Sequence, residues 1–212
     1  MLQKLKLKVC GMRDAENISR LSQLKPDYIG FIFYPQSKRY ADNLDSDALQ
    51  ALPSSIKKTG VFVNAGLKEI TERIEKFKLD AVQLHGQESP EFCMQLKPYN
   101  VELIKAFGIN NEFDFSSLES FESIIDYYLF DTKTELHGGS GKTFDWTVLD
   151  RYTLNKPYFL SGGLSAENIK EIKSINDSRL FALDLNSRFE LQPGLKDIEK
   201  LTAVFNEIKI PV

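Results

Sequence analysis

Long hydrophobic runs, paired cysteines and a strong excess of either charge are missing from this sequence. The longest apolar stretch runs only from Tyr28 to Tyr34, far short of the ~18 residues that suggest a membrane span. The 27 Lys+Arg and 30 Asp+Glu leave a formal net charge of −3, which creates no general field to attract nucleic acid or anionic lipid. We therefore expect neither a membrane protein nor a nucleic-acid-binding protein.

Cysteine and histidine are also sparse. The chain has 2 Cys and 2 His, and Cys10 and Cys93 are too far apart for a CxxC redox pair. Because no second Cys or His lies close to either one, the spacing of a zinc site is absent. We expect two reduced thiols and no metal. Residues 1–9 lack the apolar core and the cleavage site of a signal peptide, so the expected location is cytoplasmic.

Short apolar runs, each followed by a segment of helical period, recur along the chain. Of the 212 residues, 42% are apolar and 27% charged, which is typical of a globular protein, and the length fits one domain, residues 1–212. Alternating strand and helix patterns predict βα units and a parallel sheet. Eight units of about 26 residues account for the whole length. The eight apolar runs are 5–10, 28–34, 59–63, 81–85, 102–107, 127–131, 158–161 and 180–185.

The eight units predict an α/β protein, a compact single-domain (β/α)8 barrel of the TIM type. The alternative is a doubly wound open sheet, which usually has fewer strands and a glycine-rich turn after the first strand, where Gly11 stands alone here. Asp14 and Ser165 precede helical patterns as N-caps, and Pro90 lies at the first position of another helix. The last helix is expected from about 196 to 209, and the fifth and sixth helices have the weakest patterns.

In such a barrel the side chains that end the strands converge on one face, where active sites lie. Cys10 ends the first run at the entrance to a helix, whose positive end can lower the pKa of a thiol. A thiolate there is a candidate general base, and the alternative is a small buried hydrophobe. Asp131 follows four aromatic or apolar residues, so we expect it to be buried with a raised pKa, as a general acid requires. The alternative is a structural carboxylate bonded to loop amides. Cys93 lies in a helical segment and is assigned to the core.

Two glycine clusters follow strands on that same face, GGSGK at 138–142 and GG at 162–163. Glycine lets backbone amides approach an anion, and barrels of this fold often bind phosphate in the loops after strands seven and eight. The spacing is not that of a P-loop. Arg39, after the second run, is either a solvated cation or a clamp for a carboxylate. His85 is a ligand, a hydrogen-bond donor or a core histidine, without partners for a metal, and His137 is assigned no role.

Six strings of the chain resemble the phosphoribosylanthranilate isomerases, a family of tryptophan biosynthesis. They are KVCGMRDAENI (8–18), DYIGFIFYPQSKRY (27–40), GVFVN (60–64), LDAVQLHGQES (79–89), FDTK with GGSGKTFDW (130–146) and FLSGGLSAENI (159–169). The resemblance covers nearly the whole chain in the right order. It implies a (β/α)8 barrel that converts N-(5-phosphoribosyl)anthranilate into 1-(2-carboxyphenylamino)-1-deoxyribulose 5-phosphate. This reaction is an Amadori rearrangement without metal or organic cofactor.

The resemblance also implies roles for individual residues. Cys10 matches the general base that takes the proton from ribose C2′, and Asp131 matches the general acid that protonates the ring oxygen. Arg39 matches the residue that holds the anthranilate carboxylate. The other expected substrate contacts are His85 and Asp184. The phosphate is expected in the loops after strands six to eight, at Gly141, Gly162, Gly163, Ser187 and Arg188.

The chain departs from the family after its eighth strand. The family usually reads D-V-S-S-G-V-E, whereas this chain reads DLNSRFE at 184–190. Arg188 therefore replaces a glycine. We expect this change to restrict the backbone but to add positive charge to the phosphate site.

Two other functions compete with the isomerase. The related aminoaldose isomerase of histidine biosynthesis resembles a pair of strand-end aspartates, where this chain has Cys10. A non-catalytic phosphosugar-binding barrel needs Cys10 or Asp131 to be missing. We expect a small phosphosugar as partner, a monomer with a homodimer as the open alternative, and ordering of the segment 132–144 on substrate binding.

Overall fold

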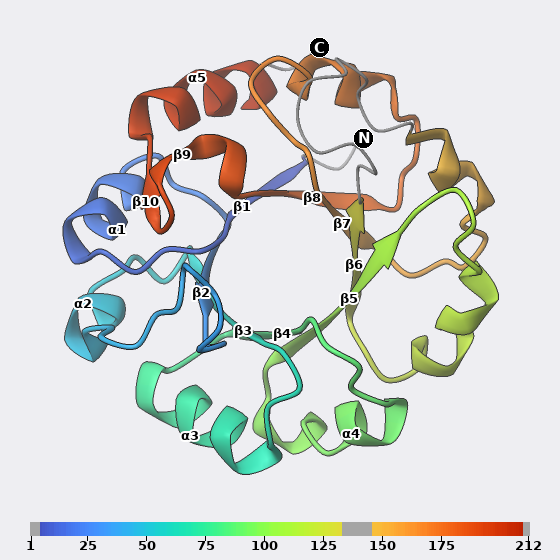
Figure 1. Ribbon diagram of the computed structural model, residues 1–212, viewed down its shortest axis with the longest axis horizontal. Helices are drawn as coiled ribbons and strands as arrows, with labels where there is room; N and C mark the ends of the chain where they lie inside the picture. Colours follow the sequence, from blue (N-terminus) through green and yellow to red (C-terminus); the bar gives the residue numbers. More distant parts are fainter. Residues whose placement is uncertain (1–4, 133–145, 210–212) are drawn as a thin grey trace.

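The computed structural model describes residues 5–132 and 146–209. Eight parallel strands close a barrel in chain order, with the last strand paired back to the first. Figure 1 looks along the barrel and shows the helices in a ring outside the strands. This architecture confirms the predicted (β/α)8 barrel, and each predicted apolar run overlaps a strand. The strands are β1 (Lys6–Val9), β2 (Tyr28–Ile32), β3 (Lys57–Phe62), β4 (Ala81–Leu84), β5 (Glu102–Ile109), β6 (Tyr127–Thr132), β7 (Tyr158–Ser161) and β8 (Leu180–Leu185).

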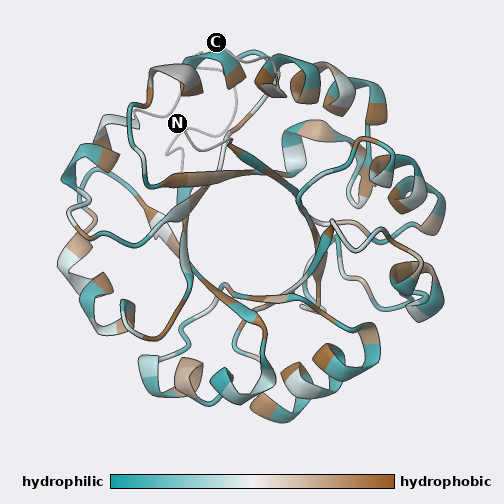
Figure 2. Cartoon of the chain, turned by 180° about the vertical axis from the view of Figure 1, so that it is seen from behind, coloured by the Kyte–Doolittle hydropathy of each residue, from teal (hydrophilic) through white to brown (hydrophobic). Residues whose placement is uncertain are grey.

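Alternation of side chains along the strands produces two apolar layers. Outward side chains, among them Leu7 and Phe62, pack against the helices in the main core. In Figure 2 the outer helices carry apolar residues beside polar ones, as elements with one buried side do. A second cluster fills the barrel interior: Tyr28, Ala81, Ile104, Ala106, Leu129, Phe159 and Ala182. Because this cluster occupies the lower layers, the room for a ligand lies toward the carboxyl ends of the strands.

The α-helices begin where the sequence supplies caps. The Asp14 carboxylate accepts the Asn17 N–H at 2.8 Å, and Pro90 opens a helix that Ser89 caps, so the predictions for Asp14 and Pro90 are confirmed. The last helix starts at Ile198, slightly later than expected. No helix within the described residues is long and apolar enough to cross a membrane. The α-helices are α1 (Ala15–Ser22), α2 (Ser46–Gln50), α3 (Leu67–Phe77), α4 (Pro90–Met94) and α5 (Ile198–Lys209).

Short 3-10 helices follow each strand from β4 to β8, and after β5, β6 and β7 they take the place of α-helices in the described chain. The N-cap predicted at Ser165 is wrong. The Asn168 side chain accepts the Ser165 N–H at 2.8 Å and donates to the Gly163 carbonyl at 2.9 Å. These two bonds close a turn over residues 163–168, and the helical segment that follows, η4, begins only at Ile169, with Asn168 at its N-cap position. The 3-10 helices are η1 (Lys97–Tyr99), η2 (Phe115–Phe121), η3 (Trp146–Arg151), η4 (Ile169–Ser174) and η5 (Ser187–Phe189).

A small antiparallel hairpin follows β8, and the sequence pattern does not predict it. Its strands are β9 (Glu190–Gln192) and β10 (Leu195–Lys196). Gly194 in its turn has a φ of +86°, a conformation that glycine adopts without strain. The Asn17 side chain of α1 donates to the Lys196 carbonyl at 2.9 Å and accepts the Lys196 N–H at 2.7 Å. The hairpin is thereby anchored to α1, next to which it lies in Figure 1.

Candidate active site

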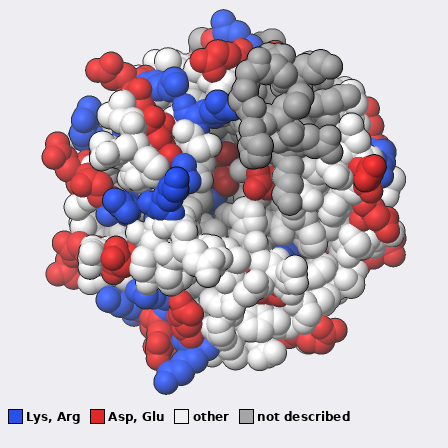
Figure 3. Space-filling view, in the orientation of Figure 1, with Lys and Arg blue, Asp and Glu red and all other residues white. Residues whose placement is uncertain are grey.

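A cavity of about 220 Å³ opens at the carboxyl ends of the strands. In the space-filling view of Figure 3, acidic side chains are visible in the hollow at the centre of the molecule, while other charged groups lie around the outside. Except for Arg188, every predicted site residue that the structure describes lines this cavity. These residues are Cys10, Arg39, His85, Asp131, Gly162, Gly163, Asp184 and Ser187.

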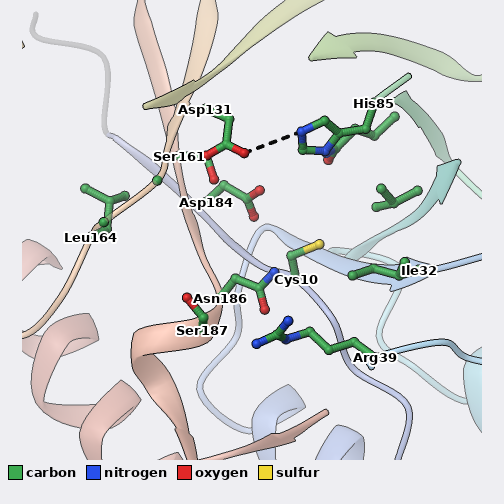
Figure 4. Close-up of a pocket in the computed structure, with 14 residues that line it drawn as sticks. Cys10, Ile32, Arg39, His85, Asp131, Ser161, Leu164, Asp184, Asn186 and Ser187 are labelled. Atoms are coloured by element: carbon green, nitrogen blue, oxygen red, sulfur yellow. Dashed lines mark hydrogen bonds and ion pairs between the residues drawn. The ribbon is translucent and has the colours of Figure 1, made fainter. Parts of the chain in front are cut away.

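Cys10 directly follows β1, and its side chain faces the cavity (Figure 4). Gly30 of β2 makes room for it, since a Cβ on Gly30 would lie 2.7 Å from the Cys10 sulfur. Burial raises the pKa of the thiol above its ordinary value, and the positive charge of Lys8 opposes that rise. Burial therefore outweighs any lowering of the pKa of Cys10 by the start of α1, where the Asp14 carboxylate already accepts the Asn17 N–H.

Lys8 and Asp184 form an ion pair inside the barrel beneath Cys10. The Lys8 Nζ lies 2.9 Å from the Asp184 Oδ1, and the two side chains are 0% and 5% exposed. The pairing follows from the strands, because Lys8 of β1 is in register with Asp184 of β8. Burial lowers the pKa of Lys8, but the charge and hydrogen bond of Asp184 outweigh it, so that this pKa lies above its ordinary value. Lys8 thus supplies a permanent cation beside the thiol.

The sequence interpretation missed Lys8, although its signal is present. Lys6 and Lys8 alternate with apolar residues in the run 5–10, and Lys8 shares the inward face of β1 with Cys10, two residues on. A buried lysine needs a carboxylate partner. The strand that would supply the partner is 176 positions away in sequence, so the pair becomes visible only in the closed barrel.

Asp131 lies on β6 and faces His85, which follows β4. The expected burial of Asp131 is wrong, since its side chain is 35% exposed at the cavity. The inward face of β6 places Leu129 in the buried interior layer and Asp131 one step closer to the opening. The His85 Nε2 lies 3.5 Å from the Asp131 Oδ2, the contact drawn in Figure 4. The Gln83 amide nitrogen lies 3.1 Å from the His85 Nδ1, so the ring is held between Gln83 and Asp131.

Arg39 lies in the loop after β2, and its side chain crosses the opening of the cavity. Gly11, with a φ of +78°, permits this path, because a Cβ there would lie 2.7 Å from the Arg39 Cδ. The Arg39 Nη2 lies 2.6 Å from the Glu190 Oε2 of the hairpin. Arg39 is therefore a fixed cation at the cavity and not a solvated one. Glu190 and its partner Lys196 are further residues that the sequence interpretation missed.

The loops after β7 and β8 lie at the same cavity. Gly162 and Gly163 have φ values of +86° and +65°, conformations that suit glycine and turn the backbone sharply. Ser187 opens η5 and also lines the cavity. Arg188 is exposed and is not among the lining residues. Gly141, His137 and the segment 133–144 lie outside the described residues. In the described part of the chain, no three His, Cys, Asp or Glu side chains are grouped to hold a metal ion.

The sequence is similar to known isomerases. A family model described as N-(5′-phosphoribosyl)anthranilate (PRA) isomerase matches residues 7–207. An N-(5′-phosphoribosyl)anthranilate isomerase of Parabacteroides distasonis is 45% identical over 207 residues, which cover 97% of this chain and 94% of that protein.

Solved structures show the same likeness. The crystal structure of phosphoribosyl anthranilate isomerase from Thermotoga maritima matches with a TM-score of 0.81 and 34% identity, covering 97% of this chain and 98% of that chain. A phosphoribosyl anthranilate isomerase in complex with reduced 1-(o-carboxyphenylamino)-1-deoxyribulose 5-phosphate matches with a TM-score of 0.79 and 30% identity over the same shares.

Proposed function

The chain belongs to the N-(5′-phosphoribosyl)anthranilate isomerase family, an isomerase family of tryptophan biosynthesis, and we propose that Asp131 and Cys10 are its catalytic acid and base. The substrate is N-(5-phosphoribosyl)anthranilate, and the product is 1-(2-carboxyphenylamino)-1-deoxyribulose 5-phosphate. The observation that carries the proposal is that Cys10 and Asp131 line one cavity together with Arg39 and two positive-φ glycines.

Asp131 opens the furanose ring in this proposal. The carboxyl group gives its proton to the ring oxygen as the bond from that oxygen to C1′ breaks, and the lone pair of the anthranilate nitrogen forms the C=N bond of a Schiff base. The partial exposure of Asp131 at the cavity supports this role, because the ring oxygen must reach the carboxyl group. His85, 3.5 Å away, orients the carboxylate between turnovers.

Cys10 acts next as the base. Its thiolate takes the proton from C2′, the pair of that C–H bond forms a C1′=C2′ double bond, and the C=N electrons return to nitrogen. The resulting enol-amine tautomerises to the ketone at C2′, so that no atom is gained or lost overall. Lys8 beneath the thiol supports this step, since a nearby cation favours the thiolate against the burial that disfavours it.

The remaining residues hold the two ends of the substrate in this proposal. Arg39 binds the anthranilate carboxylate, and Asp184 contacts the sugar. The backbone amides of Gly162, Gly163 and Ser187 bind the phosphate, as loops of positive-φ glycines do for anions. Gly141 and the exposed Arg188 are further candidates for the phosphate. The rearrangement needs no metal or cofactor, and the proposed assembly is a monomer with one phosphosugar bound.

A fluorescence assay tests the proposed function directly. Purified protein is expected to consume phosphoribosylanthranilate, followed as the loss of the anthranilate-type fluorescence. A flat trace from protein that shows a cooperative thermal transition would exclude the function. The aminoaldose substrate of histidine biosynthesis, run in parallel, tests the alternative isomerase.

A Gly30→Ala variant tests whether the position of the Cys10 thiol matters. The added Cβ would lie 2.7 Å from the Cys10 sulfur, so the thiol must move, and misplacement of a reacting group by about 1 Å costs up to about 10²-fold in rate. We expect kcat to fall within that range while the protein stays folded. The matched control is Gly66→Ala, whose added Cβ meets no atom within 4 Å. Equal kcat in the two variants would contradict the role given to the thiol.

A further inference from the structure

We propose that Glu190 is a positioning residue, which holds the Arg39 guanidinium in the orientation that binds the carboxylate of the substrate. This inference rests on the proposed function, because it concerns Arg39, the residue proposed to bind that carboxylate. The Arg39 Nε lies 2.8 and 3.1 Å from the two Glu190 carboxylate oxygens, and Nη2 lies 2.6 Å from Oε2. A bidentate contact of this kind fixes both the plane and the rotation of a guanidinium.

The contact with Glu190 uses the edge of the Arg39 guanidinium that carries Nε and Nη2, and it does not involve Nη1. Nε and Nη2 face Glu190, whereas Nη1 takes part in none of the contacts among the described residues. In Figure 4 the guanidinium lies near Asn186 and Ser187 at the cavity. An arginine with one edge fixed presents its remaining N–H donors in a set direction, which lowers the entropy lost when a carboxylate binds.

Charge balance explains why the guanidinium remains available to an anion. Glu190 is shared, because Lys196 Nζ lies 2.7 Å from its Oε1 and the Gly194 N–H also donates to it. Burial disfavours the Glu190 carboxylate, but the hydrogen bonds from Arg39 and Lys196 outweigh it and hold the pKa of Glu190 below its ordinary range. Two cations and one carboxylate leave one positive charge at the opening of the cavity, the charge that a substrate carboxylate neutralises.

The surrounding backbone is arranged to make this contact. Arg39 and Glu190 are 151 positions apart, and they meet because the hairpin folds back over the barrel. The Asn17 side chain fixes both backbone groups of Lys196, and Gly11 leaves space for the Arg39 methylenes. Glu190 is buried, with its side chain 5% exposed, while Arg39 is 23% exposed. The buried carboxylate is thus the fixed member and the arginine is the member that it aims.

The alternative is that Glu190 serves only to neutralise the buried Lys196. The two roles differ in what the substrate carboxylate contributes to binding. If Glu190 orients Arg39, the loss of Glu190 weakens the binding of ligands that carry the carboxylate and leaves the binding of ligands without it unchanged. If Glu190 only supports the hairpin, its loss weakens both classes equally.

The test measures the Kd of two ligands by calorimetry for wild type and Glu190→Gln. The first ligand is reduced 1-(o-carboxyphenylamino)-1-deoxyribulose 5-phosphate, and the second is the same molecule without its carboxylate. Glutamine keeps the shape but replaces one acceptor by a donor that faces the guanidinium. We expect Kd for the first ligand to rise about 10- to 100-fold, the range of a charge-assisted contact, and Kd for the second to stay within about 2-fold.

Two further variants keep the test decisive. Glu102→Gln removes a carboxylate that pairs with Lys57 near the start of β5, and we expect it to leave the ratio of the two Kd values at the wild-type level. The double variant Glu190→Gln with Lys196→Met leaves no unpaired lysine, so it covers the case in which the single variant fails to fold, and it is expected to show the same selective loss.

A wild-type ratio of the two Kd values in the Glu190 variants would overturn the inference, and so would equal losses on both ligands. The proposed function would fail in a different way. The wild-type protein would bind the ligand with the carboxylate more tightly than the ligand without it, but it would not convert phosphoribosylanthranilate.

Discussion

Replacing Cys10 by serine is expected to lower kcat by about 10²- to 10⁴-fold, the contribution of a removed general base. The hydroxyl occupies nearly the same volume but does not ionise near neutral pH, so no anion is present to take the C2′ proton. Asp131→Asn is expected to lose as much, because an amide cannot pass a proton to the ring oxygen. Both values come from steady-state loss of substrate fluorescence, with the thermal transition measured alongside.

The control for Cys10→Ser is the same substitution at the other cysteine. Cys93 lies in α4, is buried in the main core and does not line the cavity. Cys93→Ser is expected to lower stability, since it buries a hydroxyl among apolar groups, and to keep kcat at the wild-type level. Wild-type turnover by Cys10→Ser would mean that another group is the base.

Lys8→Met is expected to produce the largest loss of stability. It leaves the Asp184 carboxylate, 5% exposed, without the ammonium 2.9 Å away. Removing one member of a buried ion pair costs about 3–5 kcal/mol, which for a chain of this length lowers Tm by about 6–20 °C. We also expect kcat to fall, because the cation nearest the Cys10 thiol is gone. Urea denaturation and calorimetry measure the first effect, and the fluorescence assay measures the second.

The pH dependence and two controls sharpen this prediction. The pKa of Lys8 in the folded protein lies above 10.5, so its stabilising contribution is fully present at lower pH and is lost only as the pH rises through that raised value. The difference in the free energy of unfolding between wild type and Lys8→Met is therefore expected to be equal at pH 7 and pH 9.

Lys68→Met is the matched control for an exposed ion pair. It removes the partner of Glu72 and should cost no more than about 0.5 kcal/mol. The double variant Lys8→Met with Asp184→Leu should recover much of the stability that Lys8→Met alone loses. A Lys8→Met protein as stable as Lys68→Met would contradict the buried pair.

Local patterns were enough to predict the eight barrel strands and the helix start at Asp14. A buried strand can be recognised from its own run of apolar residues. The side chains of Asp14 and Ser89 each accept the backbone N–H of the residue three positions later in the chain. The family motifs are also contiguous, so the membership of the chain was predictable from the strings around Cys10, Arg39 and Asp131. The cap predicted at Ser165 failed because the Asn168 side chain closes a local turn around Ser165, and the helical segment begins only at Ile169.

The environment of each site residue depended on contacts that close only in the barrel. Asp131 is partly exposed because it lies closer to the opening of the barrel than the buried interior layer. The pKa of the Cys10 thiol is raised because the thiol is buried. Lys8 meets Asp184 across 176 positions, and Arg39 meets Glu190 across 151. The sequence by itself determined the eight barrel strands, the cap at Asp14 and the family, because these depend on neighbouring residues. Only the tertiary structure decided which charges pair at the cavity, because that depends on barrel register and on the fold of the hairpin.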